Sequence, residues 1–364
     1  MSERYLFVIP TAQIGGAERV MFNLITYLLE QQKEVTLITM SRGKQKNGWS
    51  QLEKYKNFYW IVGSYKSEKS SLIPITAKLL SLNIKFKYDY IFSSHTHVNS
   101  YLSTLKKLGL FKDSILISRE SSAVFERYQG LTIIAYKLAY RFLYGEQDLL
   151  ICQTELMKDS LIKNVGYKPV KKIEVLHNPV NIDYINSCIS KINKEKTIVA
   201  CGRLFEVKQF DLLIEAFSIF IRGNPQYKLI ILGEGSLRSE LEAQANKLNI
   251  SDKVIFMGRV NNPFEWFANS ELGVISSRIE GFPNVLLEMM TSGISKIVTT
   301  PCTDNLDKIP GLIVTDDASM QGILDGLNKA VSLNKDFSFI YREYVFENHS
   351  VDKFWNNILR LLEN

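Results

Sequence analysis

Short apolar runs alternate with longer amphipathic segments along the first half of the chain. A long helix is expected from Ala17 to Gln31, and helix-like segments separate most of the later runs. This alternation predicts a parallel sheet with helices on both faces. The expected strands are Arg4–Pro10, Val35–Met40, Phe58–Val62, Tyr90–Ser93, Ile115–Ser118 and Leu149–Cys152.

The same pattern restarts in the second half of the chain. A further short strand, Ile173–Leu176, precedes H-N-P-V-N-I-D and a polar segment, which together indicate a domain boundary. We therefore predict a first domain at 1–180, a second at 181–348, and a C-terminal segment at 349–364. That segment contains an amphipathic helix, Ser350–Leu362, expected to cross back over the first domain. The second domain's expected strands are Thr197–Cys201, Lys228–Leu232, Val254–Met257, Leu272–Ile275, Lys296–Thr299 and Leu312–Val314.

Length and composition fit a soluble two-domain protein. The chain has 364 residues, 46% of them apolar, which is enough for two hydrophobic cores. Its N-terminal apolar run, Tyr5–Pro10, is too short for a signal peptide or a membrane span, so a cytoplasmic location is expected. The four cysteines stand singly without metal-ligand spacing, and they are expected to be reduced core thiols.

The positive charge is concentrated in the first half. Residues 1–180 carry 25 Lys and Arg against 15 Asp and Glu, whereas residues 181–364 carry 19 against 23. Basic residues interleave with aromatic and aliphatic ones in Lys78–Tyr90, Lys106–Lys112 and Tyr136–Tyr144. Such surfaces suit anionic lipid headgroups, but ordinary helix faces with solvated lysines explain them equally well. No nucleic-acid motif accompanies the charge.

Candidate chemistry in the first domain follows its strands. Gly15 and Gly16 lie where the first strand turns into a helix and permit a close backbone approach to a ligand. His95 and His97 follow the strand that begins at Tyr90, and Arg119 follows the next one. A histidine taken alone is more often an ordinary loop residue, but ligands of parallel sheets bind beyond the carboxyl ends of the strands, and this position makes the three residues candidates.

The second domain shows comparable signals at successive strand ends. Gly202, Arg203 and Lys208 follow its first strand, and an Arg and Lys pair suits a diphosphate, although surface salt bridges are the plainer reading. The turn Gly233–Gly235 follows the next strand, and Gly258–Val260 ends a third, where backbone groups could pair with a nucleobase edge.

The stretch E-G-F-P-N-V-L-L-E, Glu280–Glu288, reads as loop followed by helix start. Glu280 is expected on the loop and Glu288 about one turn inside the helix, with free backbone N–H groups between them. Those amides and the helix dipole favour an anionic group. The two carboxylates are widely spaced, so each could accept hydrogen bonds from hydroxyl groups at a different end of one polyhydroxylated, phosphorylated ligand.

Five motifs together resemble the retaining glycosyltransferases of the GT-B architecture, most closely glycosyltransferase family 4. They occur in the family's order and span nearly the whole chain. The form of the last motif is similar to the group 1 branch that builds bacterial surface polysaccharides and lipid-linked oligosaccharides. The motifs are G-G-A-E-R-V at Gly15–Val20, H-N-P-V-N at His177–Asn181, G-R-L with Lys at Gly202–Lys208, G-E-G at Gly233–Gly235 and E-G-F-P-N-V-L-L-E.

The resemblance implies two Rossmann-like domains facing each other across a cleft. It also implies roles for single residues: Arg203 and Lys208 would hold the donor diphosphate, Glu280 the sugar hydroxyls and Glu288 the ribose. His95 would contact the donor sugar near its anomeric carbon, with His97 as the alternative. The full expected site has His95, Arg203, Lys208 and Glu280 as catalytic residues, and its donor-binding residues are Gly15, Gly16, Gly202, Gly235, Val260, Glu280, Gly281, Phe282, Pro283, Asn284, Val285 and Glu288.

The activity implied is metal-independent transfer, with retention, of a hexose or N-acetylhexosamine from a nucleotide diphosphate sugar, UDP-sugars being favoured. The acceptor would be a glycan or a polyprenyl-diphosphate-linked glycan at the inner face of the cytoplasmic membrane. No cofactor and no metal are expected, since the chain has no D-x-D triplet. Two alternatives stay open: a nucleotide-sugar 2-epimerase of the same fold, and a non-catalytic transferase-like subunit.

Overall fold

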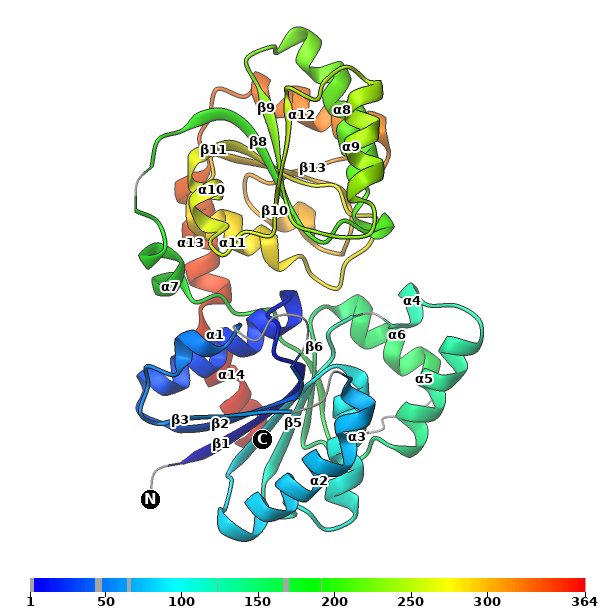
Figure 1. Cartoon of the computed structure of the whole chain (residues 1–364), viewed down its shortest axis with the longest axis vertical. Coiled ribbons are helices and arrows are strands. Elements are labelled where there is room, and N and C mark those ends of the chain that lie inside the picture. The colour runs from blue at the N-terminus through cyan, green and yellow to red at the C-terminus, as the bar shows by residue number, and fades with distance from the viewer. Residues whose placement is uncertain are drawn as a thin grey trace. The chain divides into compact units, whose positions relative to one another are not determined.

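The computed structural model describes residues 3–42, 48–63, 67–122, 124–165, 170–190 and 192–363. The chain divides into two compact units (Figure 1). Unit 1 comprises Met1–Pro179 together with Val351–Asn364, and unit 2 comprises Val180–Ser350. The chain therefore passes between the units twice, at Pro179–Val180 and at Ser350–Val351. The sequence-based boundaries lay within one or two residues of these points.

Unit 1 alternates strands and helices over most of its length. Its strands are β1 (Arg4–Thr11), β2 (Glu34–Ser41), β3 (Phe58–Val62), β4 (Tyr90–Ser94), β5 (Ile115–Arg119), β6 (Leu149–Cys152) and β7 (Ile173–Val175). Its helices are α1 (Gly16–Glu30), α2 (Glu68–Lys85), α3 (Thr96–Lys107), α4 (Val124–Arg127), α5 (Leu131–Phe142), α6 (Glu155–Val165) and α14 (Val351–Glu363), with a short 3₁₀ helix η1 (Ser50–Leu52).

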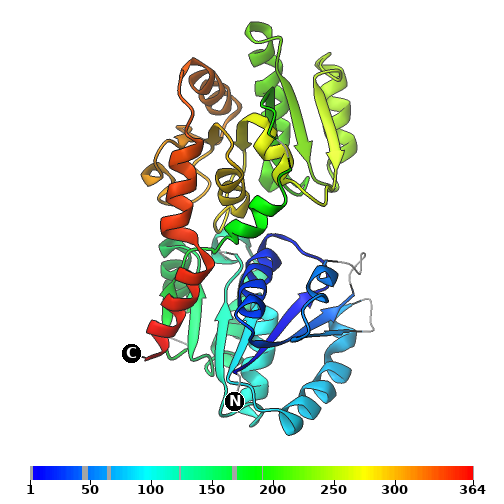
Figure 2. The same ribbon diagram turned by 90° about the vertical axis from the view of Figure 1, so that its left-hand side faces the viewer.

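The seven strands of unit 1 form one parallel sheet in the order β3-β2-β1-β4-β5-β6-β7. Right-handed crossovers then put α1 on one face and α2, α3, α5 and α6 on the other. α14 packs beside α1, as Figures 1 and 2 both show. β1 is buried along Tyr5–Pro10, and the rings of Phe7 and Phe92 stack at 4.7 Å between neighbouring strands. Strands buried on both faces read as continuous apolar runs, which is why the sequence revealed them.

The C-terminal helix α14 returns to the sheet of unit 1 through an aromatic anchor. Trp355 is 7% exposed and lies edge-on to Tyr5 at 5.6 Å and to Tyr90 at 5.4 Å. The ammonium of Lys172 donates to the carbonyl of Leu361 at 2.7 Å. The last helix is therefore part of the core of unit 1 although unit 2 separates it in sequence.

Unit 2 repeats the arrangement with six strands. Its strands are β8 (Glu195–Cys201), β9 (Lys228–Leu232), β10 (Val254–Gly258), β11 (Ser270–Ile275), β12 (Lys296–Thr299) and β13 (Ile313–Val314). Its helices are α7 (Ile182–Ser187), α8 (Phe210–Gly223), α9 (Arg238–Lys247), α10 (Phe264–Asn269), α11 (Asn284–Ser292), α12 (Met320–Ser332) and α13 (Ser338–His349), with 3₁₀ helices η2 (Glu206–Lys208) and η3 (Leu306–Lys308).

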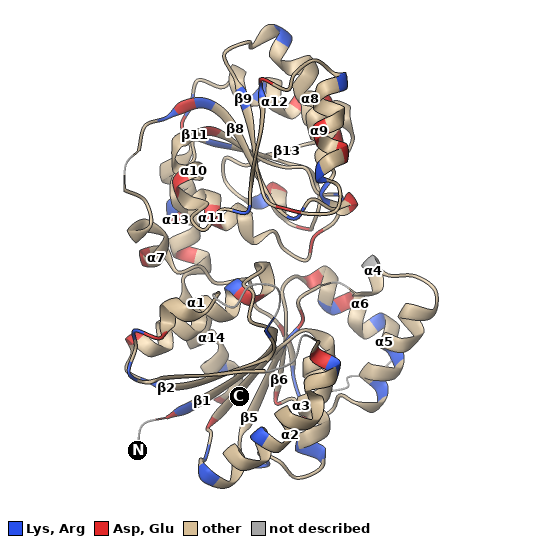
Figure 3. Ribbon diagram, in the orientation of Figure 1, with Lys and Arg blue, Asp and Glu red and all other residues tan. Residues whose placement is uncertain are grey.

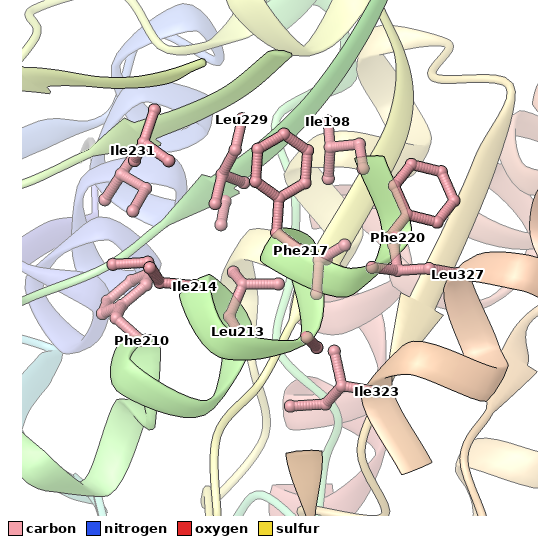
Figure 4. Close-up of a cluster of buried hydrophobic side chains, with 14 of the residues drawn as sticks. Ile198, Phe210, Leu213, Ile214, Phe217, Phe220, Leu229, Ile231, Ile323 and Leu327 are labelled. Carbon is pink, nitrogen blue, oxygen red and sulfur yellow. The ribbon is translucent and has the colours of Figure 1, made fainter. Parts of the chain in front are cut away.

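The sheet of unit 2 is parallel in the order β10-β9-β8-β11-β12-β13. α8 buries Phe217 and Phe220 against β8, β9 and α12, as Figure 4 shows for the side chains Ile198, Leu229 and Leu327. The predicted α/β class with two Rossmann-like parallel-sheet domains is confirmed. One minor expectation is corrected: of the four free cysteines, Cys152 and Cys302 are buried, whereas Cys188 and Cys201 are only partly so.

Candidate functional site

The strand order of unit 2 creates a switch point at the carboxyl ends of β8 and β11. The chain leaves β8 toward β9 and β10, and returns to the other side of β8 at β11. The two loops that follow β8 and β11 therefore diverge from adjacent strand ends, which is where open parallel sheets bind ligands. Lys208 follows β8 and Glu280 follows β11.

Lys208 and Glu280 meet at this switch point. The Lys208 ammonium forms an ion pair with Oε1 of Glu280, and the side chains are only 21% and 18% exposed. The Ser277 hydroxyl donates to the same carboxylate oxygen at 2.7 Å. A cation and a carboxylate thus stand side by side in a partly desolvated position, where their interactions with a ligand are stronger than in open water.

The backbone holds the pair in place from both sides. The Ser276 hydroxyl donates to the carbonyl of Lys208 at 2.6 Å, and the Arg278 amide donates to that of Val207 at 2.8 Å. On the β12 side, the Glu280 amide donates to the carbonyl of Cys302 at 2.8 Å, and the Thr303 hydroxyl to that of Gly281 at 3.0 Å. The loop after β11 is therefore clamped between its two neighbours.

The glycines near these loops allow the backbone to approach closely. A Cβ on Gly235 would lie 2.3 Å from the carbonyl oxygen of Leu204. Gly233 has φ +141°, and a Cβ there would lie 1.9 Å from the oxygen of Gly202. The G-E-G turn is thus packed against the β8 loop, and larger residues would push that loop and Lys208 out of position.

The remaining predicted residues of unit 2 lie at the same edge of the sheet but differ in their exposure and contacts. The exposed Arg203 guanidinium lies over the ring of Phe205 at 5.5 Å. α11 begins at Asn284 after the N-cap Pro283, so Glu288 lies about one turn inside the helix as expected. Val260 is half-buried against the core of unit 2.

The residues between the two glutamates are partly covered. Pro283 is buried, while Gly281, Asn284 and Val285 are half-buried. The ring of Phe282 packs against that of His349 at 5.8 Å. Near the β12 end, the Asp304 carboxylate accepts hydrogen bonds from its neighbours Thr303 and Asn305.

Unit 1 has an equivalent switch point between β1 and β4. The loop with Gly15 follows β1, and His95 follows β4. Glu18, in the first turn of α1, accepts a hydrogen bond from the Gly15 amide at 3.1 Å, and its Oε1 lies 3.6 Å from Nε2 of His95. A Cβ on Gly15 would come within 2.8 Å of the Glu18 carboxylate, so a larger residue there would displace that side chain from its present contact.

His95 has an uncommon backbone conformation and a perturbed pKa. It caps the start of α3 with φ +77° and ψ +134°, a region that costs a non-glycine residue about 1–3 kcal/mol. Burial lowers the pKa of His95 below its ordinary 6.5, against the opposing effect of the Glu18 carboxylate. The imidazole is therefore neutral near pH 7. Strain and burial of this kind are common where a side chain has a functional position.

His97, by contrast, points its imidazole toward α2. Its Nε2 lies 2.6 Å from the Glu68 carboxylate, and the side chain is 54% exposed. The two histidines are close, with ring centroids 5.9 Å apart, but only His95 adjoins Glu18.

A buried polar network beside His95 was not expected in detail. Arg119 is 1% exposed and donates to Oδ1 of Asn178 at 2.5 Å, and burial lowers the pKa of its guanidinium to about 10. Glu120, also 1% exposed, accepts from Thr96 at 2.9 Å and from Tyr144 at 2.5 Å. The network connects the β5 end to the H-N-P-V-N motif. Its only signal in the sequence was the charged R-E pair directly after an apolar strand.

Two residues of the candidate site escaped the sequence reasoning. Glu18 entered the sequence analysis only as part of the G-G-A-E-R-V motif, and Ser277 was assigned no role. Both act through partners that are near in space because of the strand order. Among the described residues, no cluster of three or more His, Cys, Asp or Glu side chains could hold a metal ion.

Comparisons with known proteins agree with this architecture. The model of the family described as "Glycosyl transferases group 1" matches residues 186–338, and that of "Glycosyltransferase Family 4" matches residues 14–184. One solved structure, Anabaena HepE in complex with UDP and glucose, aligns with a TM-score of 0.79 at 16% identity and covers 99% of both chains.

Two similar proteins come from Campylobacter jejuni. One is 29% identical over 301 residues, 80% of this chain and 78% of the relative, and is named N-acetylgalactosamine-N,N'-diacetylbacillosaminyl-diphospho-undecaprenol 4-alpha-N-acetylgalactosaminyltransferase. The other, an alpha-1,4-N-acetyl-D-galactosaminyltransferase acting on a diNAcBac-PP-undecaprenol glycan, is 24% identical over 95% of this chain and 91% of its own. With two family models that together span most of both units, the chain belongs to the group 1 glycosyltransferases of the GT-B fold.

Proposed function

We propose that this glycosyltransferase transfers a hexose or N-acetylhexosamine, with retention, from a UDP-sugar to a glycan carried on polyprenyl diphosphate. The observation that carries the proposal is the Lys208–Glu280 pair at the switch point of unit 2. A nucleotide diphosphate sugar combines an anion with neutral hydroxyl groups. An ammonium suits the first, and a carboxylate accepts hydrogen bonds from the second.

The other residues of unit 2 are assigned to the rest of the donor. Arg203 and Lys208 bind the diphosphate and neutralise the charge that develops as it leaves, a role that electrostatics makes large in a partly desolvated site. Glu280 accepts from the sugar hydroxyls and Glu288 from the ribose hydroxyls. Gly202, Gly235 and Val260 line the nucleotide, and the backbone from Gly281 through Phe282, Pro283 and Asn284 to Val285 cradles sugar and phosphate.

In this proposal, unit 1 binds the acceptor and contacts the donor sugar near its anomeric carbon. Gly15 and Gly16 allow the backbone to come close to the diphosphate. His95, whose Nε2 lies 3.6 Å from the Glu18 carboxylate, contacts the donor sugar near its anomeric carbon, and its neutral imidazole can donate or accept a hydrogen bond without adding charge.

The proposed chemistry is a front-side displacement. The acceptor hydroxyl oxygen forms a bond to the anomeric carbon on the face from which the bond to the β-phosphate oxygen breaks, and the hydroxyl proton passes to the departing diphosphate. Glu280, already bonded to Lys208 and Ser277, serves as a grip and not as a nucleophile. No metal is required by this scheme, so activity should survive a chelator.

The relatives support the acceptor. Both named Campylobacter jejuni enzymes extend a glycan on an undecaprenol diphosphate. The Anabaena structure, whose ligand is UDP, supports the donor base. An acceptor with a polyprenyl chain also implies peripheral contact with the inner face of the cytoplasmic membrane.

A two-step experiment tests the proposal. A thermal-shift panel of nucleotide sugars first identifies the donor, because a ligand that binds only the folded state raises the melting temperature. The donor is then incubated with a polyprenyl-diphosphate-linked glycan and the product's anomeric configuration is read by NMR. An inverted linkage would overturn the proposed retention. An epimerised nucleotide sugar formed without acceptor would indicate an epimerase in place of a transferase. Loss of activity with chelator and recovery with manganese would overturn metal independence.

A further inference from the structure

Helix α5 of unit 1 exposes apolar side chains on the side that faces away from the sheet. Leu131, Ile134, Leu138 and Phe142 recur at helical spacing and are 84%, 53%, 51% and 63% exposed. At 3.6 residues per turn they form one ridge. The one fully buried residue on the opposite side is Tyr140. A surface helix normally turns polar residues outward, whereas α5 is apolar on its outward side as well as on the side that packs in the core.

Helix α2 carries a second ridge of the same kind. Ile73 is 84% exposed, Leu80 42% and Ile84 83%, and they recur with a spacing of seven and four residues. The inward side of α2 buries Ile75 and Leu79 against the sheet. The two ridges are thus unpartnered apolar surfaces on two different helices of unit 1.

Both helices are docked on α3, on the same face of the sheet. The hydroxyls of Thr76 in α2 and Tyr101 in α3 lie 2.7 Å apart, and Lys107 at the end of α3 donates to the backbone carbonyls of Phe142 and Tyr144. Figure 1 shows α2, α3 and α5 in one layer. The two ridges therefore belong to a single surface, which we call the α2–α5 face and define as the outward sides of these two helices.

Basic side chains border the ridges. Lys137 and Arg141 lie on one border of the α5 ridge, and α5 contains no acidic residue. On α2, Lys69 is exposed one turn before Ile73 beside the line of the ridge, whereas the exposed Lys78 and Lys85 lie about 120–140° around the helix from it. Figure 3 shows α5 with basic and no acidic positions. An apolar ridge edged by Lys and Arg matches the boundary between acyl chains and anionic headgroups.

We propose that the α2–α5 face binds the surface of a membrane containing anionic phospholipid. The charge pattern selects this partner over a second copy of the chain, because a two-fold contact through the face would set the basic borders of both copies against each other. Within the described part of the chain, no helix is long and apolar enough to cross a membrane. The proposal rests on the proposed function in one respect: it explains how the enzyme reaches an acceptor anchored by a polyprenyl chain.

The test measures binding of the full-length protein to vesicles of equal parts phosphatidylglycerol and phosphatidylethanolamine, with pure phosphatidylcholine vesicles for comparison. The wild type should sediment with the anionic vesicles at low salt and be released as salt rises. The double variants Ile73→Glu/Ile84→Glu and Leu131→Glu/Phe142→Glu should each lower the partition coefficient at least about tenfold.

A matched control is available on α13 of unit 2. Phe339 and Phe346 are 70% and 64% exposed, and the variant Phe339→Glu/Phe346→Glu should bind vesicles like the wild type. The proposal is overturned if the wild type does not bind anionic vesicles, if both face variants bind normally, or if the control loses binding equally. A wild-type dimer in sedimentation velocity that the face variants abolish would also overturn it, in favour of self-association.

A parallel transfer assay with a water-soluble, short-chain acceptor separates this proposal from the proposed function. The face variants should keep wild-type turnover in that assay and lose it with acceptor embedded in vesicles. Vesicle binding without transfer to any lipid-linked acceptor would refute the proposed function and leave the membrane face standing. Transfer without vesicle binding would do the opposite.

Discussion

Substitutions in the Lys208–Glu280 ion pair should show whether the two residues bind the donor or only stabilise the loops that carry them. The Lys208 ammonium forms an ion pair with the Glu280 carboxylate, so a diphosphate has to compete with Glu280 for it. Replacing Glu280 by Gln removes the competing charge and keeps an acceptor for the Ser277 hydroxyl. We therefore expect Glu280→Gln to bind UDP more tightly than the wild type while transferring sugar more slowly.

The size of the effect follows from the burial of the pair. Two unit charges 4 Å apart attract by about 4 kcal/mol at an effective dielectric of 20. Both side chains are about one-fifth exposed, and desolvation offsets much of this attraction, which leaves about 1–2 kcal/mol. Since 1.4 kcal/mol is a factor of ten, UDP affinity should rise about 5- to 30-fold. Turnover should fall about 10²- to 10³-fold, as when a group that binds the transition state is lost.

Lys208→Met should do the opposite to UDP affinity, lowering it by at least about tenfold, and should also abolish most turnover. Calorimetric titration with UDP and a radiolabelled transfer assay measure the two quantities. Glu271→Gln is the matched control, because Glu271 is also 18% exposed and paired with a lysine, Lys196 at 2.8 Å, but near the opposite ends of β8 and β11. If Glu280→Gln weakens UDP binding as much as Lys208→Met does, the pair is a structural unit and the reasoning is wrong. Near-normal turnover in both variants would show that the pair does not belong to the catalytic site, and absence of turnover in the wild type would indicate a non-catalytic subunit.

Three further predictions concern the supports of the site. Gly235→Ala forces a Cβ against the Leu204 carbonyl and should cost at least about 2 kcal/mol in urea unfolding, whereas Gly223→Ala, with open space around it, should be neutral. Because burial holds the pKa of His95 below 6.5, the unfolded state binds more protons there, and stability should fall as pH drops through 6.5, by up to about 1.4 kcal/mol per pH unit. When the free energy of unfolding is measured at several pH values, its dependence on pH below 6.5 should be weaker in His95→Asn than in the wild type. Trp355→Ala should destabilise unit 1 by about 3–5 kcal/mol, visible as an earlier calorimetric transition.

The strands and the candidate loops were predictable for a local reason. A strand buried on both faces needs a continuous apolar run, and Lys208 and Glu280 lie in the loops that follow such runs. The start of α11 was also predictable, because Pro283 and Asn284 suit the first positions of a helix. These features depend only on neighbours along the chain.

The pairing of side chains could not be predicted in the same way. Glu18 and His95 belong to segments far apart in sequence, and they meet because β4 returns to the other side of β1. The positive φ of His95 was not predicted, since a positive φ is uncommon for any residue other than glycine, although histidine adopts it more often than most. Arg119 was predicted only as a candidate at the end of its strand and Glu120 was assigned no role, yet both side chains are 1% exposed. The contact between Glu18 and His95 follows from the strand order, which short motifs do not encode.

The same topological position carries different chemistry in the two units. In unit 2 the switch point holds a lysine with a glutamate, and in unit 1 it holds a neutral histidine with a glutamate. Only the first offers a cation to a diphosphate, whereas the second offers hydrogen bonds to groups without charge. We infer that the units divide the substrates by charge: the anionic part of the donor goes to unit 2, and the hydroxyl groups that react go to the side of His95. A His95→Lys variant tests this division, because a cation beside uncharged hydroxyl groups should leave UDP affinity close to that of the wild type while transfer is lost. A clear tightening of UDP binding would place position 95 beside the diphosphate and contradict the division.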